Sequence, residues 1–286
     1  MTTNEPVWDL LVVGGGINGA GIAADAAGRG LSVLLCEKGD LAGATSSASS
    51  KLVHGGLRYL EHFEFGLVRK ALAEREVLLA KAPHIIHPLR FVLPHMNTVR
   101  PAWMIRIGLF LYDHLARHPR LPNSHGVNLR EDPTGAPLQA ALSKGFVYSD
   151  CWVDDARLVV CNAMAAAERG ADIRTRTELV EARRHGGLWQ ARLHDHADGS
   201  TITVAARALV NAAGPWVESL LHGPLALQDT EGVRLVKGSH IVAPRLFEGA
   251  HAYILQHTDR RVVFVMPFEG DFSLIGTTDV VLSGAP

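Results

Sequence analysis

The chain has 286 residues, of which 47% are hydrophobic and 20% are charged, and its formal net charge is −1. Because no overall positive field would attract nucleic acid, we expect no nucleic-acid partner. No apolar run reaches the ~18 residues that a spanning helix needs, and three cysteines without C-x-x-C spacing favour reduced thiols in the cytoplasm and no metal site.

Residues 9–37 predict a strand, a glycine turn, a helix and a second strand. The apolar run 10–13 is a short buried strand, and the alanine-rich helix spans about 17–27. The spacing between them is G-x-G-x-x-G, in which glycine permits a tight turn and a close approach to a pyrophosphate. The glycines of this motif are Gly14, Gly16 and Gly19.

The helix that follows this motif begins with Ile17 and Asn18, whose backbone amides are free to bind phosphate at the positive end of the helix dipole. The second strand, 31–36, ends at Glu37, where a carboxylate can accept hydrogen bonds from ribose hydroxyls. The order of these elements predicts a dinucleotide site. The alternative is a glycine-rich turn in an ordinary α/β domain.

Residues 42–51 are small and rich in hydroxyl groups, which suits a turn lying along a cofactor better than a core strand. A flexible linker is the alternative. The candidate cofactor residues after Glu37 are Lys38, Thr45, Ser46, Ser47, Ser49 and Ser50. Two glycines, Gly55 and Gly56, then let backbone approach a flat ring, with His54, Arg58 and Tyr59 beside them.

Apolar periodicity predicts three more helices, and alternating apolar runs predict strands. The helices are expected at 61–82, 101–117 and 156–169, the last capped by Asp154 or Asp155. Residues 121–141 are read as a loop. The helix at 101–117 has aromatic residues and flanking arginines, which is typical of an interfacial helix, although an ordinary core helix remains the alternative. The expected strands are 91–93, bounded by Pro88 and Pro94, one starting at 146–148, a meander of 172–184, 189–194 and 201–206, and several runs after residue 233.

Several long sequence blocks resemble the flavin-dependent, quinone-linked glycerol-3-phosphate dehydrogenases of aerobic metabolism. The resemblance starts at TSSASSKLVHGGLRYLE and continues through ALAEREVLLAKAPH, RPAWMIRIGLFLYDHL, YSDCWVDDARLVV, LVNAAGPW, RLVKGSHIV, AYILQ and IGTTDV, so it covers essentially the whole chain. Members of that family continue well beyond the point equivalent to Pro286, with a further phosphate-binding arginine, a Gly-Gly-Lys segment and a helical C-terminal domain.

The resemblance implies oxidation of sn-glycerol 3-phosphate to dihydroxyacetone phosphate by FAD, with electrons passed to membrane quinone. It implies a peripheral position on the inner face of the cytoplasmic membrane, and it leaves a homodimer open. Two alternatives are an oxidase that uses oxygen and a non-catalytic FAD-binding fragment. An NAD-linked dehydrogenase is disfavoured by the serine-rich turn after Glu37.

The resemblance also assigns roles to residues. Arg58 would bind the substrate phosphate, since the guanidinium fork binds phosphate with two hydrogen bonds, with Tyr59 and Thr278 beside it. Ala213 and Gly214 resemble the second flavin-contact motif of flavoproteins with two dinucleotide folds. Histidine titrates in the right range for a catalytic base, so His54 and His240 are candidates for that role, and a different residue is the alternative.

The expected fold class is α/β: a Rossmann-like FAD-binding domain with a second, mostly antiparallel β substrate domain, incomplete at its C-terminal end. The FAD-binding domain would be discontinuous, formed by 1–90 and 145–228. The substrate or cap domain would be formed by 91–144 and 229–286.

Overall fold

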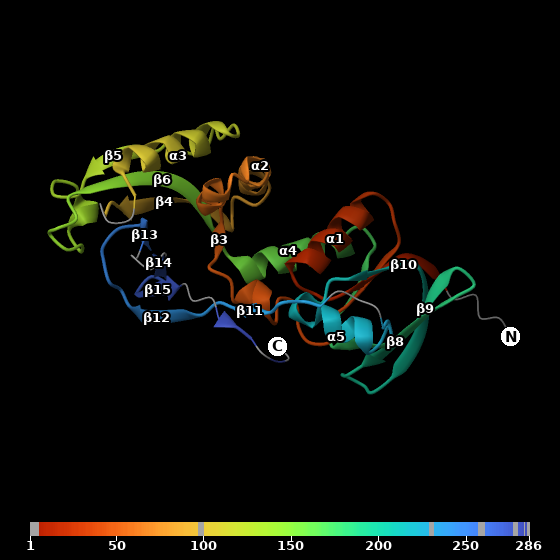
Figure 1. Ribbon diagram of the computed structural model, residues 1–286. Helices are drawn as coiled ribbons and strands as arrows, with labels where there is room; N and C mark the ends of the chain where they lie inside the picture. The colour runs from red at the N-terminus through yellow and green to blue at the C-terminus, as the bar shows by residue number, and fades with distance from the viewer. Residues whose placement is uncertain are drawn as a thin grey trace. The chain divides into compact units, whose positions relative to one another are not determined.

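The computed structural model describes residues 6–96, 100–228, 232–256, 261–276, 280–282 and 284. The chain forms two compact units (Figure 1). The first unit comprises Met1–Ser49, Asp154–Leu235 and Val281–Pro286, and the second comprises Ser50–Val153 and Val236–Val280. In the described part of the chain, no helix is both long enough and apolar enough to cross a membrane.

A six-stranded sheet forms the centre of the first unit, in the order β7-β2-β1-β10-β9-β8. The first four strands in this order are parallel, and β10, β9 and β8 form an antiparallel meander. The strands are β1 (Val7–Val13), β2 (Val33–Cys36), β7 (Asp172–Arg174), β8 (Thr177–His185), β9 (Leu188–Asp195) and β10 (Thr201–Asn211). This confirms the predicted Rossmann-like fold class.

Two helices, α1 (Ile17–Gly28) and α4 (Asp155–Ala167), pack side by side on one face of this sheet (Figure 1). The small alanine side chains let the two helices approach each other and the sheet closely, and Ala23, Ala26 and Ala166 are buried with Val12 of β1. Asp154 caps α4, because its carboxylate accepts a hydrogen bond from the Arg157 amide. Smaller helical elements of the unit are η1 (Thr45–Ser47), η4 (Gly214–Trp216) and α5 (Val217–His222).

The predicted strand 172–184 is wrong as a single element. Arg176 adopts a left-handed backbone (φ +53°), so the chain leaves β7 beside β2 and starts β8 in the meander. By contrast, 201–206 and 208–211 form one continuous strand, β10, whose first half pairs with β9 and whose second half pairs with β1.

The second unit is built on a mostly antiparallel sheet in the order β12-β15-β14-β13-β4-β6-β3, with β5 also paired to β6. Only the β13–β4 pair among the described strands of this sheet is parallel. The strands of this unit are β3 (Leu52–Val53), β4 (Ile86–Pro94), β5 (His125–Asn128), β6 (Lys144–Val153), β11 (Val236–Lys237), β12 (His240–Pro244), β13 (Ala252–Gln256), β14 (Val262–Phe268) and β15 (Phe272–Gly276), and β16 (Val280–Val281) follows.

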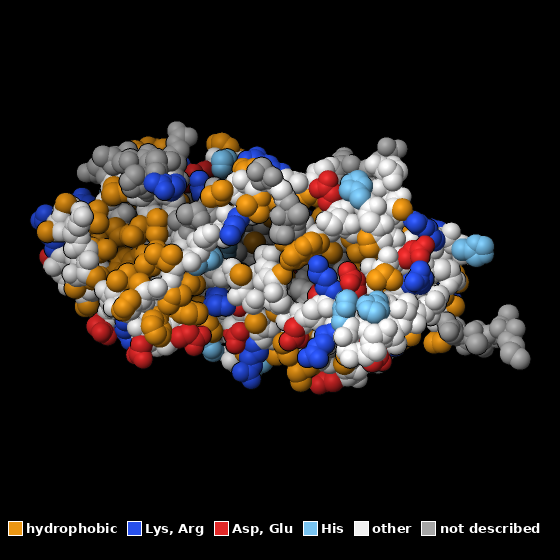
Figure 2. Space-filling view, turned by 90° about the horizontal axis from the view of Figure 1, so that it is seen from below, with side chains coloured by type: hydrophobic (Ala, Val, Ile, Leu, Met, Phe, Trp, Pro, Cys, Tyr) orange, Lys and Arg blue, Asp and Glu red, His pale blue; other side chains and the backbone are white. Residues whose placement is uncertain are grey.

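Helices α2 (Phe65–Lys81) and α3 (Ala102–His114) pack on one face of this sheet, where Phe91 and Leu93 of β4 meet Leu72 and Leu109. Val92 points to the opposite face and packs with Leu129 from the segment before β6. Two short 3-10 helices, η2 (Leu57–His62) and η3 (Pro133–Gly135), complete the unit. Figure 2 shows hydrophobic side chains gathered where Figure 1 places β12–β15, and Ile241, Val242, Leu246 and Phe272 are exposed there.

Three predictions about this part of the chain need correction. Residues 121–141 are not a plain loop, because β5 pairs with β6. Pro88 does not bound β4 but lies within it, paired with Cys151 of β6, because the strand already begins at Ile86, whereas Pro94 is its last residue. The compact units also divide at Ser49 and Val153, not at residues 90 and 145, because β3 and β4 both belong to the sheet of the second unit. Which unit binds cofactor and which binds substrate stays a prediction.

Candidate functional site

The first glycine turn (residues 14–19) joins β1 to α1 at a distance that only glycine permits. Gly14 has φ +115°, and a Cβ on it would collide with the carbonyl oxygen of Ala212. A Cβ on Gly19 would collide with the carbonyl oxygen of Gly14. The turn and the first residues of α1 therefore form a cradle of close backbone, with Ile17 and Asn18 exposed at the helix N-terminus.

Glu37 connects this turn to the tip of β2. Its Oε2 accepts a hydrogen bond of 2.7 Å from the Gly15 amide, and its Oε1 accepts one of 2.8 Å from Gly39. Gly15 was missed as a site residue, yet a Cβ there would lie 2.8 Å from the Cβ of Glu37. Each carboxylate oxygen keeps a second lone pair for a ribose hydroxyl, so the ribose role predicted for Glu37 fits this geometry.

The hydroxyl-rich segment folds across the N-terminus of α1. Ser46 Oγ accepts a hydrogen bond of 2.9 Å from the Ile17 amide, and a Cβ on Gly16 would lie 3.0 Å from that oxygen. Ser49 Oγ donates a hydrogen bond of 2.7 Å to Asp155 at the start of α4. These contacts contradict the flexible-linker alternative. Thr45 and Ser47 lie in the same 3-10 turn and are exposed.

The predicted second motif lies at the end of β10, next to the first glycine turn. The Ala212 amide donates to the Val13 carbonyl at 2.8 Å, and Ala213 and Gly214 follow directly, with Gly214 exposed at φ +55°. The Lys38 ammonium lies 4.7 Å from the ring centre of Trp216. The residues predicted from separate motifs in this unit therefore meet at the carboxyl ends of β1, β2 and β10, where ligands of open α/β sheets bind.

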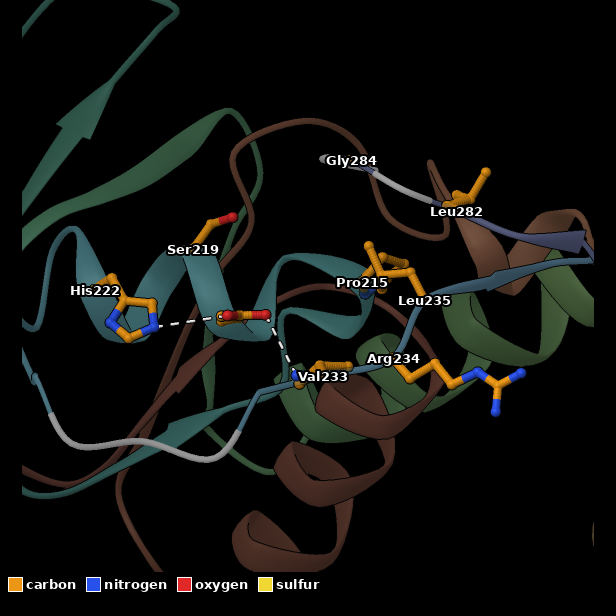
Figure 3. A pocket seen from close by; sticks show the side chains of 9 residues that line it. Pro215, Ser219, His222, Val233, Arg234, Leu235, Leu282 and Gly284 are labelled. Carbon is orange, nitrogen blue, oxygen red and sulfur yellow. Dashed lines mark hydrogen bonds and ion pairs between the residues drawn. The ribbon is translucent and has the colours of Figure 1, made fainter.

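A pocket of about 420 Å³ lies elsewhere on the first unit, beside α5 (Figure 3). Glu218 accepts a hydrogen bond from the Val233 amide at 3.3 Å and lies 3.7 Å from His222. None of the described residues predicted for cofactor or substrate lines this pocket. We therefore identify the candidate site by its motifs and by the close backbone contacts of the first glycine turn, and not by the volume of the pocket beside α5.

The second glycine turn (residues 54–56) belongs to the second unit and is buried at both glycines. The Gly55 amide donates a hydrogen bond of 2.7 Å to the Tyr112 hydroxyl, and a Cβ on Gly55 would lie 2.7 Å from the same oxygen. The Gly56 amide donates to Nδ1 of His54 at 3.1 Å. His54 itself is exposed, so the turn presents a histidine from a buried backbone.

A buried charge network supports this turn. Tyr112 donates a hydrogen bond of 2.7 Å to Asp150, and Arg75 Nη1 lies 2.6 Å from the same carboxylate oxygen. All three residues are 2% exposed. Burial raises the pKa of Asp150, and the facing Arg75 opposes that rise. Sequence analysis missed this network. The available signal was Arg75 on the buried face of α2, spaced with Val68, Leu72 and Leu79.

The predicted substrate residues lie close to the second glycine turn along the chain. Arg58 and Tyr59 are on η2 and exposed, Tyr59 by 47%. The Tyr59 ring packs so closely on Gly56 that a Cβ there would collide with it. Thr278 lies outside the described residues.

His240, the other candidate base, begins β12. Its Nε2 lies 2.8 Å from Ser50 Oγ. The structure thus brings together one residue predicted for catalysis and one predicted for the cofactor, which are 190 positions apart in the chain.

Comparison with known proteins gives a family and several relatives. The family of FAD dependent oxidoreductases matches residues 9–285. Glycerol-3-phosphate dehydrogenase from Pseudomonas tolaasii is 61% identical over 98% of this chain and 54% of its own length. D-erythritol 1-phosphate dehydrogenase from Brucella abortus is 59% identical over 96% of this chain and 55% of its own length. The chain thus spans about half the length of the curated relatives it matches.

A solved structure agrees with these relatives. The crystal structure of glycerol-3-phosphate dehydrogenase from Bacillus halodurans complexed with FAD superposes with a TM-score of 0.75 and 30% identity, covering 98% of this chain and 49% of that one. The similarity to glycerol-3-phosphate dehydrogenases that the sequence blocks indicate is confirmed. With a family match that extends over nearly all its residues and a cradle that fits a dinucleotide, the chain belongs to the FAD dependent oxidoreductases.

Proposed function

We propose that this chain carries out the FAD-dependent oxidation of sn-glycerol 3-phosphate to dihydroxyacetone phosphate, with electrons passed to membrane quinone. The observation that carries the proposal is the meeting of three motifs at the carboxyl ends of β1, β2 and β10, in a chain 61% identical to a glycerol-3-phosphate dehydrogenase. When bound, FAD supplies the hydride acceptor, and the protein supplies placement and charge.

The first unit offers the dinucleotide a cradle and hydrogen-bonding groups. The α1 N-terminus and the first glycine turn suit the pyrophosphate, and Glu37 suits the adenosine ribose. The residues that we assign to FAD in this unit are Gly14, Gly16, Ile17, Asn18, Gly19, Glu37, Lys38, Thr45, Ser46, Ser47, Ser49, Ala213 and Gly214. Those that we assign to it in the second unit are Ser50, Gly55 and Gly56.

The second unit supplies the groups for the substrate. Arg58 is exposed and can bind phosphate through its guanidinium fork, and the adjacent Tyr59 can donate a hydrogen bond from its hydroxyl. His54 or His240 takes the proton of the hydroxyl at C2 while hydride leaves the same carbon. Thr278 completes the set.

Helix α3 supports a peripheral position on the inner face of the cytoplasmic membrane. One side of the helix is buried at Leu109 and Tyr112, whereas Trp103, Ile107 and Phe110 on the other side are each more than half exposed. An exposed apolar face with arginines beside it can insert at the boundary of headgroups and acyl chains. Such a position would bring the enzyme to its quinone.

The alternatives to this proposal are one other substrate, one other electron acceptor and one role without catalysis. The 59% identity to D-erythritol 1-phosphate dehydrogenase favours a polyol phosphate one carbon longer as a second candidate substrate. Oxygen as acceptor would make the chain part of an oxidase, and a fragment that binds FAD without turnover is the third alternative.

A visible spectrum of the purified chain tests the proposal. We expect flavin absorbance that bleaches when glycerol 3-phosphate is added without oxygen. Bleaching by D-erythritol 1-phosphate alone would change the substrate, and hydrogen peroxide after oxygen is admitted would change the acceptor. Flavin that no substrate bleaches would support the non-catalytic alternative, and a folded sample that takes up no added FAD would contradict the proposal.

A further inference from the structure

We propose that Ser50 is a positioning residue for His240, and that together they make His240 the catalytic base. Ser50 Oγ accepts a hydrogen bond from Nε2–H of His240. Nδ1 is then the ring nitrogen with a free lone pair, which takes the proton of the substrate hydroxyl. The inference rests on the proposed function for the reaction itself, whereas the contact between the two side chains is independent of it.

The contact between the two residues is short and joins distant parts of the chain. Ser50 Oγ and His240 Nε2 are 2.8 Å apart, and both residues are half-buried in the second unit. A hydrogen bond to one ring nitrogen orients the ring, and where that nitrogen is the donor the other nitrogen of a neutral histidine keeps its lone pair. A hydroxyl is suited to this task because its oxygen accepts as well as donates.

The neighbouring strand is shaped to hold the ring in this place. Gly276 of β15 lies directly opposite His240 of β12 in the antiparallel ladder. A Cβ on Gly276 would lie 2.6 Å from Nε2 of His240 and would collide with Cδ2. The missing side chain therefore lets the imidazole lie against the backbone of β15, which is one reason for glycine in a strand.

Ser50 is also held by its surroundings. Lys51, the next residue, has φ +55°, a left-handed conformation that costs energy for any residue with a Cβ. Its carbonyl accepts a hydrogen bond of 2.9 Å from the Val153 amide, and β3 begins at once beside β6. Strain of this kind persists where the surrounding structure determines the conformation, and it is typical of functional sites.

Other serines of the hydroxyl-rich segment have different partners. Ser46 binds the Ile17 amide, Ser47 donates to the Ala44 carbonyl, and Ser49 donates to Asp155. Ser50 is bonded to a histidine, which makes it the serine of this segment that we assign to positioning a base.

The two candidate bases differ in which ring nitrogen already has a hydrogen-bond partner. Nδ1 of His54 accepts a hydrogen bond from the Gly56 amide at 3.1 Å. In the neutral ring its Nε2 must then carry the proton, so neither nitrogen of His54 has a free lone pair. With Ser50 accepting from Nε2–H, Nδ1 of His240 keeps its lone pair, and none of the residues that the structure describes is bonded to it. The geometry therefore favours His240.

The experiment measures the tautomer by nitrogen NMR on the full chain labelled at histidine, at about pH 9, where an ordinary histidine is neutral. His240→Gln identifies the signal. We expect the wild-type signal to report the Nε2–H tautomer. Ser50→Ala and Gly276→Ala should each convert it to a mixture, the first by removing the acceptor and the second by displacing the ring.

Matched controls come from the same unit. Ser143→Ala removes a half-buried hydroxyl before β6, and Gly126→Ala adds a Cβ in β5 that would lie 4.0 Å from the Gly145 carbonyl oxygen. Both should leave the His240 signal unchanged. A wild-type Nδ1–H tautomer, or a signal that Ser50→Ala does not alter, would overturn the proposal.

A second readout tests the consequence for chemistry. In flavin-loaded chain, Ser50→Ala should slow bleaching by glycerol 3-phosphate about tenfold or more and His240→Gln by about a hundredfold or more, since a general base contributes roughly 10²–10⁴. Bleaching by Ser50→Ala at the wild-type rate would overturn the positioning role. Wild-type chain with the expected tautomer and no bleaching would instead contradict the proposed function and support the contact.

Discussion

The first glycine turn and the second glycine turn both bring backbone closer to its surroundings than a Cβ would allow, but different partners surround them. At residues 14–19 the close neighbours are mostly backbone atoms and the Glu37 side chain, which lies 22 positions from Gly15. At residues 54–56 the supporting groups are the side chains of Tyr112, Asp150 and Arg75, of which Tyr112 and Asp150, 57 and 95 positions from Gly55, accept hydrogen bonds from its amide.

This difference separates two ways of building a site. A turn made by close backbone contact needs glycines at fixed spacing, so its motif is visible in the sequence even though one close neighbour, Ala212 directly after β10, is distant in the chain. A turn resting on a buried ion pair depends on residues from three other elements, and removing one of them leaves a charge without its partner. We therefore expect the second turn to be far more sensitive to distant substitutions than the first.

Asp150→Ala should give the largest loss of stability, about 3–5 kcal/mol, because it removes the carboxylate 2.6 Å from the buried Arg75 and leaves it only the longer ion pair of 3.8 Å with Glu76 among the described residues. Urea unfolding followed by circular dichroism measures this loss. The double variant Arg75→Met with Asp150→Leu is the control, because it removes both charges and should recover most of the stability. A single variant as stable as wild type would show that the network does not hold the second turn.

Gly19→Ala should cost about 1–3 kcal/mol through overpacking and should abolish FAD uptake, because the new Cβ collides with the Gly14 carbonyl. Flavin absorbance after gel filtration measures uptake. Gly21→Ala is the matched control on the same helix, where a Cβ meets nothing within 4 Å. It should keep its flavin and gain about 0.5–1 kcal/mol from helix propensity. Equal flavin content in the two variants would contradict the cradle.

Tyr112→Phe should cost about 1–2 kcal/mol, less than the loss of Asp150, because it removes a hydroxyl that accepts from Gly55 and donates to Asp150 while both charges remain. The difference between the two variants in urea unfolding measures how much of the support comes from the hydroxyl. Should Tyr112→Phe prove as harmful as Asp150→Ala, the tyrosine and not the ion pair would be the main support.

Asp9→Asn should give the smallest effect, at the far end of the first sheet. Asp9 accepts hydrogen bonds from the amide and hydroxyl of Ser32, and these bonds lower the pKa of its carboxyl. A lowered pKa in the folded chain stabilises it above the unfolded value of about 3.9, and this is lost as the pH falls through the folded pKa. The difference in urea midpoint between variant and wild type should therefore be present at pH 7 and shrink below about pH 4. An equal difference at both pH values would exclude the ionised carboxylate as its cause.

Much of the first unit follows from local sequence. The strand before Gly14, the alanine-rich α1 and the acid at the end of β2 are each specified by neighbours within about 30 residues, and the structure places them as predicted. The long β10 was not predicted as one strand, because its two halves read as separate runs around Arg207. Pairing with β9 and then β1 joins them.

The partners of two segments, residues 54–56 and 42–51, could not be predicted from the sequence. Two glycines and a histidine at 54–56 are visible as a motif, but nothing near them in the chain indicates Asp150 or Tyr112. Likewise, the segment 42–51 reads as a turn or a linker, and only its contacts with Ile17 and Asp155 decide the matter.

The sequence by itself determined the dinucleotide motif, the family resemblance and two candidate histidines, because these depend on residue types at short spacing. The tertiary structure alone decided the partners of these residues: Gly15 with Glu37, Asp150 with Arg75, and Ser50 with His240. The physical reason is that a hydrogen bond depends on distance in space, and folding brings Ser50 and His240, which are 190 positions apart in the chain, within 2.8 Å.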